Sequence, residues 1–121
     1  MNEEKIRKFI FNELSKFKFK KYTKGFKYLN EVIYICIIDI DAIDNLNKNV
    51  FPKIANKYHE KSYLNVKWCI EGIINTMYNN TEMNIIAKYF NLEDNVKPSL
   101  KLITYTVVCR YNIQAKNEYS N

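Results

Sequence analysis

The residues best suited to chemistry lie in the middle of the chain, and their types favour recognition of a nucleic acid over catalysis. An asparagine amide can pair with the edge of an adenine, and a lysine can bind guanine or a phosphate. Ser62 is placed to begin a helix, and the backbone N–H groups at a helix start can hold a phosphate. The outward positions that follow are Asn65, Lys67, Trp68, Glu71 and Asn75, with Lys61 just before the helix.

Two of these residues fit a nucleic acid less well. Glu71 repels phosphates unless it accepts a hydrogen bond from cytosine N4. An outward Trp68 suits a protein interface or a contact with a sugar or a thymine methyl group. It could also signal an error in the helical phase, in which case the ring is buried. The residue types leave these alternatives open.

No catalytic, metal or cofactor site is predicted. His59, the one histidine, lies alone in a turn and is expected to be exposed, because a single histidine without a partner nucleophile supports no catalysis. Asp39 and Asp41 fall on different faces of a helix, which favours solvated carboxylates over a metal site. The three cysteines lie in apolar stretches without a Cys-x-x-Cys pair, so we expect them to be reduced and buried. We therefore expect neither an enzyme nor a small-molecule substrate.

The charge of the chain is unevenly placed. The chain has 121 residues and a net charge of +6. Residues 1–27 hold nine basic and three acidic residues, while the rest hold equal numbers of each sign, so the whole excess is N-terminal. Such a concentration suits a polyanion. We expect Lys16, Lys18, Lys20, Lys21 and Lys24 to hold phosphates, and the alternative is that these lysines only aid solubility.

Composition and apolar spacing together predict one all-α domain. Apolar residues make up 47% of the chain, and glycine and proline together number four, which disfavours disorder and hairpin-rich β folds. Gly25 is expected to mark a break after a basic connector. The expected helices, from apolar spacing and start signals, cover residues 2–17, 52–58, 62–78, 82–90 and 98–112.

One stretch is ambiguous, and two helix starts are expected from their residue types. Residues 31–43 are rich in valine, isoleucine and tyrosine, which favours a strand by propensity alone. Thr81 is expected to cap the helix at 82–90, which would bury Met83 and Ile86. Pro98 is expected to open the last helix, because proline is tolerated in a first turn.

Residues 52–78 have the spacing of a helix-turn-helix. Ala55 is small where two crossing helices must approach, and Tyr58 can close the angle between them. Val66 and Ile70 face inward from the second helix. A purely structural corner would show the same pattern. The local excess of lysine over glutamate favours the DNA-binding interpretation.

Several short motifs resemble one known family. The stretch Lys24-Gly25-Phe26-Lys27-Tyr28-Leu29-Asn30-Glu31 is similar to the opening of the DNA-binding effector domain of the sporulation master response regulator of endospore-forming bacteria. Three later motifs follow in the same order and at nearly the same spacing. They are Phe51-Pro52-Lys53-Ile54-Ala55-Asn56-Lys57-Tyr58, Tyr89-Phe90-Asn91 and Lys97-Pro98-Ser99.

The resemblance covers about residues 20–113 and implies a six-helix domain in which residues 31–43 are helical. It divides the chain into a basic N-terminal helix and connector, residues 1–20, and an effector-like region, residues 21–113. The family carries a receiver domain ahead of the effector domain. Only about 20 residues precede the resemblance here, so we expect a stand-alone relative or a cut piece.

The recognition helix departs from the family pattern. Alignment on Val66 places Asn65, Trp68 and Glu71 where the family has arginines, and Gly72 where it has histidine. Arginine binds guanine through two hydrogen bonds, so the family's operator preference is not expected to carry over.

The sequence predicts a transcriptional regulator that binds double-stranded DNA through a helix-turn-helix. Because the family binds repeated sites, a homodimer on DNA is expected. The alternative is a helical protein-interaction module that kept the fold and lost operator reading. A membrane-surface role is disfavoured, because Phe17 and Phe19 offer little area for insertion. The chain lacks the pattern of a signal peptide, and its longest apolar run is too short to span a membrane, so we expect a cytoplasmic protein.

Overall fold

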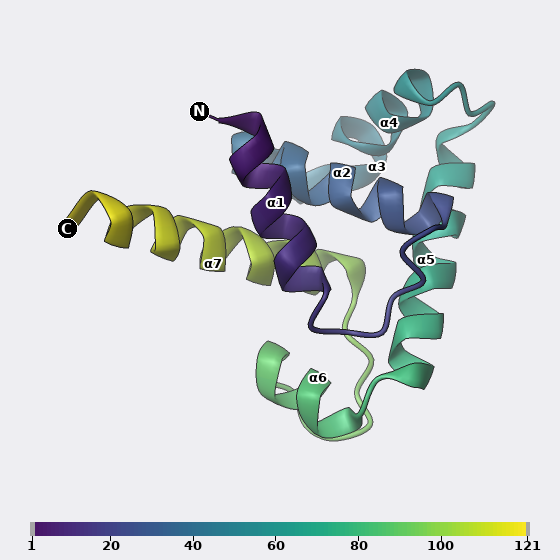
Figure 1. Ribbon diagram of the computed structural model, residues 1–121. Coiled ribbons are helices and arrows are strands. Elements are labelled where there is room, and N and C mark those ends of the chain that lie inside the picture. Colours follow the sequence, from purple (N-terminus) through teal and green to yellow (C-terminus); the bar gives the residue numbers. More distant parts are fainter. Residues whose placement is uncertain (1, 121) are drawn as a thin grey trace.

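The computed structural model describes residues 2–120 and is built from helices throughout that range (Figure 1). This confirms the predicted all-α domain with a helix-turn-helix. The described part contains one helix more than expected, besides a 3-10 helix. The elements are α1 (Glu3–Leu14), α2 (Lys24–Ile38), the 3-10 helix η1 (Ile40–Asn45), α3 (Leu46–Asn49), α4 (Phe51–Lys57), α5 (Tyr63–Asn80), α6 (Met83–Phe90) and α7 (Leu100–Ser120).

The ambiguous stretch at 31–43 is helical, as the resemblance implied. It forms most of α2 and the start of η1. Helix α2 contacts α1, α4, α5 and α7, which bury Val32 and Ile33 and partly bury Ile35 and Ile37, so packing overrides the strand propensity of these residues. Asp39 ends α2 in an extended conformation, and its side chain accepts a hydrogen bond from the Asp41 backbone N–H to begin η1.

Helices α2 and α5 touch at Gly25. A Cβ atom at this position would lie 2.3 Å from the carbonyl oxygen of Cys69 and 2.7 Å from Cγ2 of Ile73. Only glycine allows this approach, so the expectation that Gly25 breaks the chain is wrong. It is the second residue of α2 and sets the crossing that turns one side of α5 into the core.

A buried carboxylate joins three helices. Oε1 of Glu31 in α2 accepts hydrogen bonds from Arg7 Nη1 at 3.0 Å, Lys57 Nζ at 3.1 Å and Tyr58 OH at 3.0 Å. These partners lie in α1 and at the end of α4. Burial alone would raise the pKa of Glu31, but the hydrogen bonds from these partners outweigh it and hold the pKa below its ordinary value.

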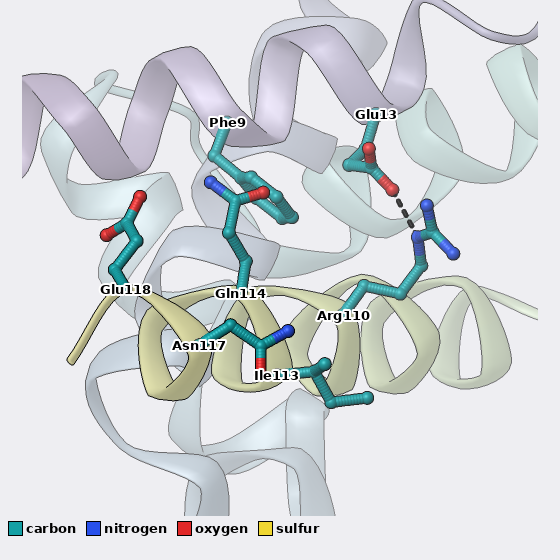
Figure 2. A pocket seen from close by; sticks show the side chains of 7 residues that line it. All are labelled: Phe9, Glu13, Arg110, Ile113, Gln114, Asn117 and Glu118. Atoms are coloured by element: carbon teal, nitrogen blue, oxygen red, sulfur yellow. Dashed lines mark hydrogen bonds and ion pairs between the residues drawn. The ribbon is translucent and has the colours of Figure 1, made fainter. Parts of the chain in front are cut away.

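A second buried carboxylate anchors the other end of α1. Glu13 accepts hydrogen bonds from Arg110 in α7 and from Tyr89 OH at 2.9 Å, and it pairs with Lys16 Nζ at 2.9 Å. Figure 2 shows the Glu13 and Arg110 side chains pointing toward each other across the space between α1 and α7. Burial opposes ionisation here too, but the three partners hold the pKa of Glu13 below its usual value.

Two of the expected helix starts are wrong. Thr81 is buried and does not cap α6. Its hydroxyl accepts a hydrogen bond from the Lys18 backbone N–H at 2.9 Å, a partner distant in sequence. Helix α7 begins at Leu100, two residues after Pro98, and the Ser99 hydroxyl accepts from the Leu102 backbone N–H. The helix also continues beyond the expected end, as far as Ser120.

Some burial expectations also fail. Cys36 is buried, and this burial raises the pKa of its thiol to about 11, with the Asp39 carboxylate adding to the effect. Cys69 and Cys109 are only half-buried, because they lie at the margins of the apolar faces of α5 and α7. Met83 is exposed at the first residue of α6, while Ile86 is buried as expected.

We predict that Glu31→Gln destabilises the fold by about 2 kcal/mol at pH 7, because it removes a charged acceptor that three side chains share. The folded-state pKa of Glu31 is lowered, so its contribution is present above the unfolded-state pKa and is lost as the pH falls through the folded-state pKa. Urea unfolding at several pH values tests this. The control is Glu4→Gln, at an exposed site of α1. Equal stability of both variants at pH 7 would refute the assignment.

Candidate nucleic-acid interface

Helices α4 and α5 form the predicted helix-turn-helix. Ala55 is buried where the two helices meet, and the turn occupies residues 58–62. His59 is exposed, as expected, and has a left-handed backbone with φ of 59°. This conformation reverses the chain, and the Glu60 backbone N–H then donates to the Ala55 carbonyl at 2.9 Å. The turn therefore has a structural explanation without any chemistry for His59.

Ser62 caps α5 as predicted. Its backbone is extended, and its hydroxyl accepts a hydrogen bond from the Leu64 N–H at 3.1 Å. Glu60 is held away from the helix start by Tyr28, whose hydroxyl donates to it at 2.5 Å. Burial and this carboxylate raise the pKa of Tyr28, so it remains a donor. Lys61 is exposed beside the cap. Because Glu60 is engaged by Tyr28 and Lys61 adds positive charge, the start of α5 can accept an anion.

The predicted outward residues of α5 divide into two strips. The spacing of an α-helix puts Asn65, Trp68 and Gly72 on one strip, which we call the outer strip. Trp68 is 59% exposed, which excludes the alternative of a buried ring. Asn65 is half-buried and Gly72 is exposed. An aromatic ring of this size in water marks a surface that contacts a partner.

The groove strip consists of Lys67, Glu71 and Asn75. It borders two adjoining hollows of about 390 and 370 Å³ at the start of α7. Lys97, which sequence reasoning did not select, donates from Nζ to Asn75 Oδ1 at 2.5 Å. The amide oxygen of Asn75 is therefore already engaged within the protein. Lys101 lines the first hollow, so the segment before and at the start of α7 adds two lysines beside α5.

A second basic edge lies on the other side of α5. Residues 15–23 run from α1 to α2, and their path is fixed by the Lys18–Thr81 hydrogen bond and by the Gly25 contact with α5. Phe17 and Phe19 are buried in this segment, so the alternating Lys18 and Lys20 point into solvent. Neither ammonium group has a carboxylate within 4.0 Å among residues 2–120.

Three other lysines of the N-terminal segment have partners within the protein. Lys24 Nζ lies 3.9 Å from the Glu60 carboxylate, and Lys21 Nζ lies 4.9 Å above the Phe11 ring. Both side chains are still exposed. Lys16 is paired with buried Glu13 and belongs to the core network. The expectation that Lys16 binds a phosphate is therefore not supported, and Lys18 and Lys20 are the least engaged of the predicted phosphate-binding lysines.

A third hollow lies between α1 and the C-terminal half of α7 (Figure 2), and this half of α7 extends away from α5 (Figure 1). It measures about 380 Å³ and is lined by Phe9, Glu13, Arg110, Ile113, Gln114, Asn117 and Glu118. Its charged groups are engaged within the protein, since Glu13 binds Arg110 and Glu118 binds Lys5 at 2.9 Å. Its lining includes no serine, cysteine or histidine, so it offers none of the usual nucleophiles.

The fold and the α4–α5 arrangement define a helix-turn-helix domain. The chain matches the family described as "Sporulation initiation factor Spo0A C terminal" over residues 10–106, and it belongs to this family. The match confirms the resemblance seen in the motifs, and the family is one of DNA-binding regulator domains of sporulation rather than of enzymes. No curated protein matches the chain. Within residues 2–120, no helix combines the length and apolar character that crossing a membrane requires.

The basic edge yields a prediction on salt dependence. The double substitution of Lys18→Ala with Lys21→Ala should weaken binding to any duplex about equally, because phosphate contacts do not depend on sequence. It should also flatten the slope of log affinity against log salt by roughly 2. Fluorescence anisotropy of a labelled duplex at several salt concentrations measures both effects. Lys8→Ala with Lys88→Ala, which also removes two exposed charges, is the matched control. If the two pairs of substitutions change the slope equally, Lys18 and Lys21 are general solubility charges.

Proposed function

We propose that this chain is a sequence-specific transcriptional regulator that places α5 in the major groove of duplex DNA. The proposal rests chiefly on one observation. The exposed side of α5 lies between two edges that carry lysines, residues 15–24 on one side and residues 97–101 on the other. Lysines that flank a recognition helix can bind the phosphates on either side of a groove.

The residues of the interface divide by role. Lys18, Lys21, Lys24 and Lys61 would contact phosphates, as would the N–H groups at the start of α5 that Ser62 leaves open. Asn65 would pair with an adenine edge, and Lys67 would bind guanine or a phosphate. The engagement of Asn75 by Lys97 favours a supporting role for Asn75, because its amide oxygen is occupied. Two copies on adjacent half-sites would suit the homodimer expected on DNA.

One observation favours a different function. Trp68 is 59% exposed and lies one turn from exposed Glu71, and a large aromatic residue is the typical centre of a protein interface. A helical protein-interaction module would use this surface without reading an operator. The two functions differ in which substitutions on α5 affect DNA binding.

We predict that Asn65→Ala and Lys67→Ala each reduce affinity for the selected DNA site by roughly 1–3 kcal/mol. The site would be obtained by selection of bound fragments with the purified protein. The loss at Asn65 should be much smaller on random duplex, because base contacts carry sequence information and phosphate contacts do not. Anisotropy titrations on both duplexes measure the difference.

Trp68→Ala provides the comparison for the interaction module. If Trp68 is the centre of a protein interface, its removal should weaken self-association by about 2 kcal/mol or more, measured by sedimentation. The regulator proposal fails if selection enriches no sequence and Trp68→Ala abolishes association while Asn65→Ala and Lys67→Ala leave DNA binding unchanged.

A further inference from the structure

Gly72 has no explanation within the fold. It lies in the interior of α5, where glycine is less favourable than any residue except proline. A Cβ atom added at Gly72 would meet no heavy atom within 4 Å, in contrast to Gly25, where it would clash with the backbone of α5. The protein could therefore hold alanine at this position and be more stable. The backbone at Gly72 is therefore open to close approach by a binding partner.

The neighbours of Gly72 on the outer strip are an aromatic ring and an amide, while Asn75, one turn after it on the groove strip, holds Lys97. Trp68 lies one turn before Gly72 with 59% of its surface exposed, and Asn65 completes the outer strip. One turn after it, the Thr76 hydroxyl folds back to donate to the Gly72 carbonyl at 3.0 Å. The space beside the Gly72 backbone is thus left open between an indole ring and short polar side chains.

Neither arginine of the chain can serve this surface. The two arginines are Arg7 and Arg110, and their guanidinium groups bind the buried carboxylates of Glu31 and Glu13. The only charged residues of α5 are Lys67 and Glu71, and both lie on the groove strip. The outer strip therefore lacks the side chain that most often reads guanine, and holds groups that suit adenine and the thymine methyl.

We propose that the outer strip reads A·T base pairs, with the α5 backbone at Gly72 close enough to the base edges for a thymine methyl group to occupy the space that a Cβ atom would fill. Asn65 pairs with an adenine edge, and the Trp68 ring covers the methyl group from the side. This inference rests on the proposed function, since it assumes that α5 enters the major groove.

The test combines a change in the protein with a change in the DNA. Gly72→Ala should raise the midpoint of thermal unfolding by about 4 °C, because it improves helix propensity. It should also weaken binding to the selected site about tenfold, because the new methyl group competes for space with the thymine methyl. Asn12→Ala, an exposed helix position on α1, should leave DNA affinity unchanged and is the control.

Replacing the contacted thymines by deoxyuridine removes only their methyl groups. Wild-type protein should then bind about fourfold more weakly, because an apolar contact is lost. The Gly72→Ala variant should bind the deoxyuridine site at least as well as the thymine site. This reversal distinguishes a filled space from general damage to the interface.

Three outcomes overturn the inference. An unchanged affinity of Gly72→Ala for the selected site would contradict it. An equal loss of affinity by Gly72→Ala on the thymine site and on the deoxyuridine site would contradict it as well. A selected site with a G·C centre would also overturn it, and the proposed function would then survive. If selection enriches no sequence at all, the proposed function fails and the inference fails with it.

Discussion

Helices α2 and α5 touch at Gly25, where a Cβ atom would lie 2.3 Å from the carbonyl oxygen of Cys69. This contact fixes the rotation of α5 about its own axis. Val66, Ile70 and Met77 are then turned into the core, and Trp68 and Gly72 are necessarily turned outward. The same contact brings the basic segment before α2 alongside α5. One close crossing thus determines both the composition of the exposed strip and the position of its lysine-bearing edge.

The two buried carboxylates neutralise part of the positive charge of the chain and also stabilise the fold. Glu31 and Glu13 engage both arginines together with Lys57 and Lys16, so of the nine basic residues in the N-terminal segment only Arg7 and Lys16 belong to these core networks. The charge beside α5 that remains for a polyanion consists of exposed lysines. Lysine holds phosphates as a point charge but lacks the planar fork of arginine, so this surface is suited to phosphate contact more than to reading guanine. In the proposed complex, sequence would be read by the Asn65 amide, by Lys67 and by the apolar groups of α5.

The features predicted correctly from sequence are those that depend on neighbouring residues. The Ser62 cap, the turn at His59 and the inward face at Val66 and Ile70 follow from local spacing, and the helical state of residues 31–43 followed from the family motifs. The failures involve distant partners. Thr81 looked like a cap but binds the Lys18 backbone across the fold. The ion pair of Glu31 with Arg7 could not be predicted from the sequence, because helical periodicity does not show which cation a buried carboxylate contacts.

The most direct measurement follows Trp68, the single tryptophan of the chain, during DNA binding. Its ring is 59% exposed in the centre of the proposed surface, so its fluorescence reports contact at that place alone. Titration with the selected duplex should change the tryptophan emission, and the change should saturate at the DNA concentration at which anisotropy of the labelled duplex also saturates. A duplex that binds by anisotropy while the emission of Trp68 stays unchanged would contradict the placement of α5 against DNA.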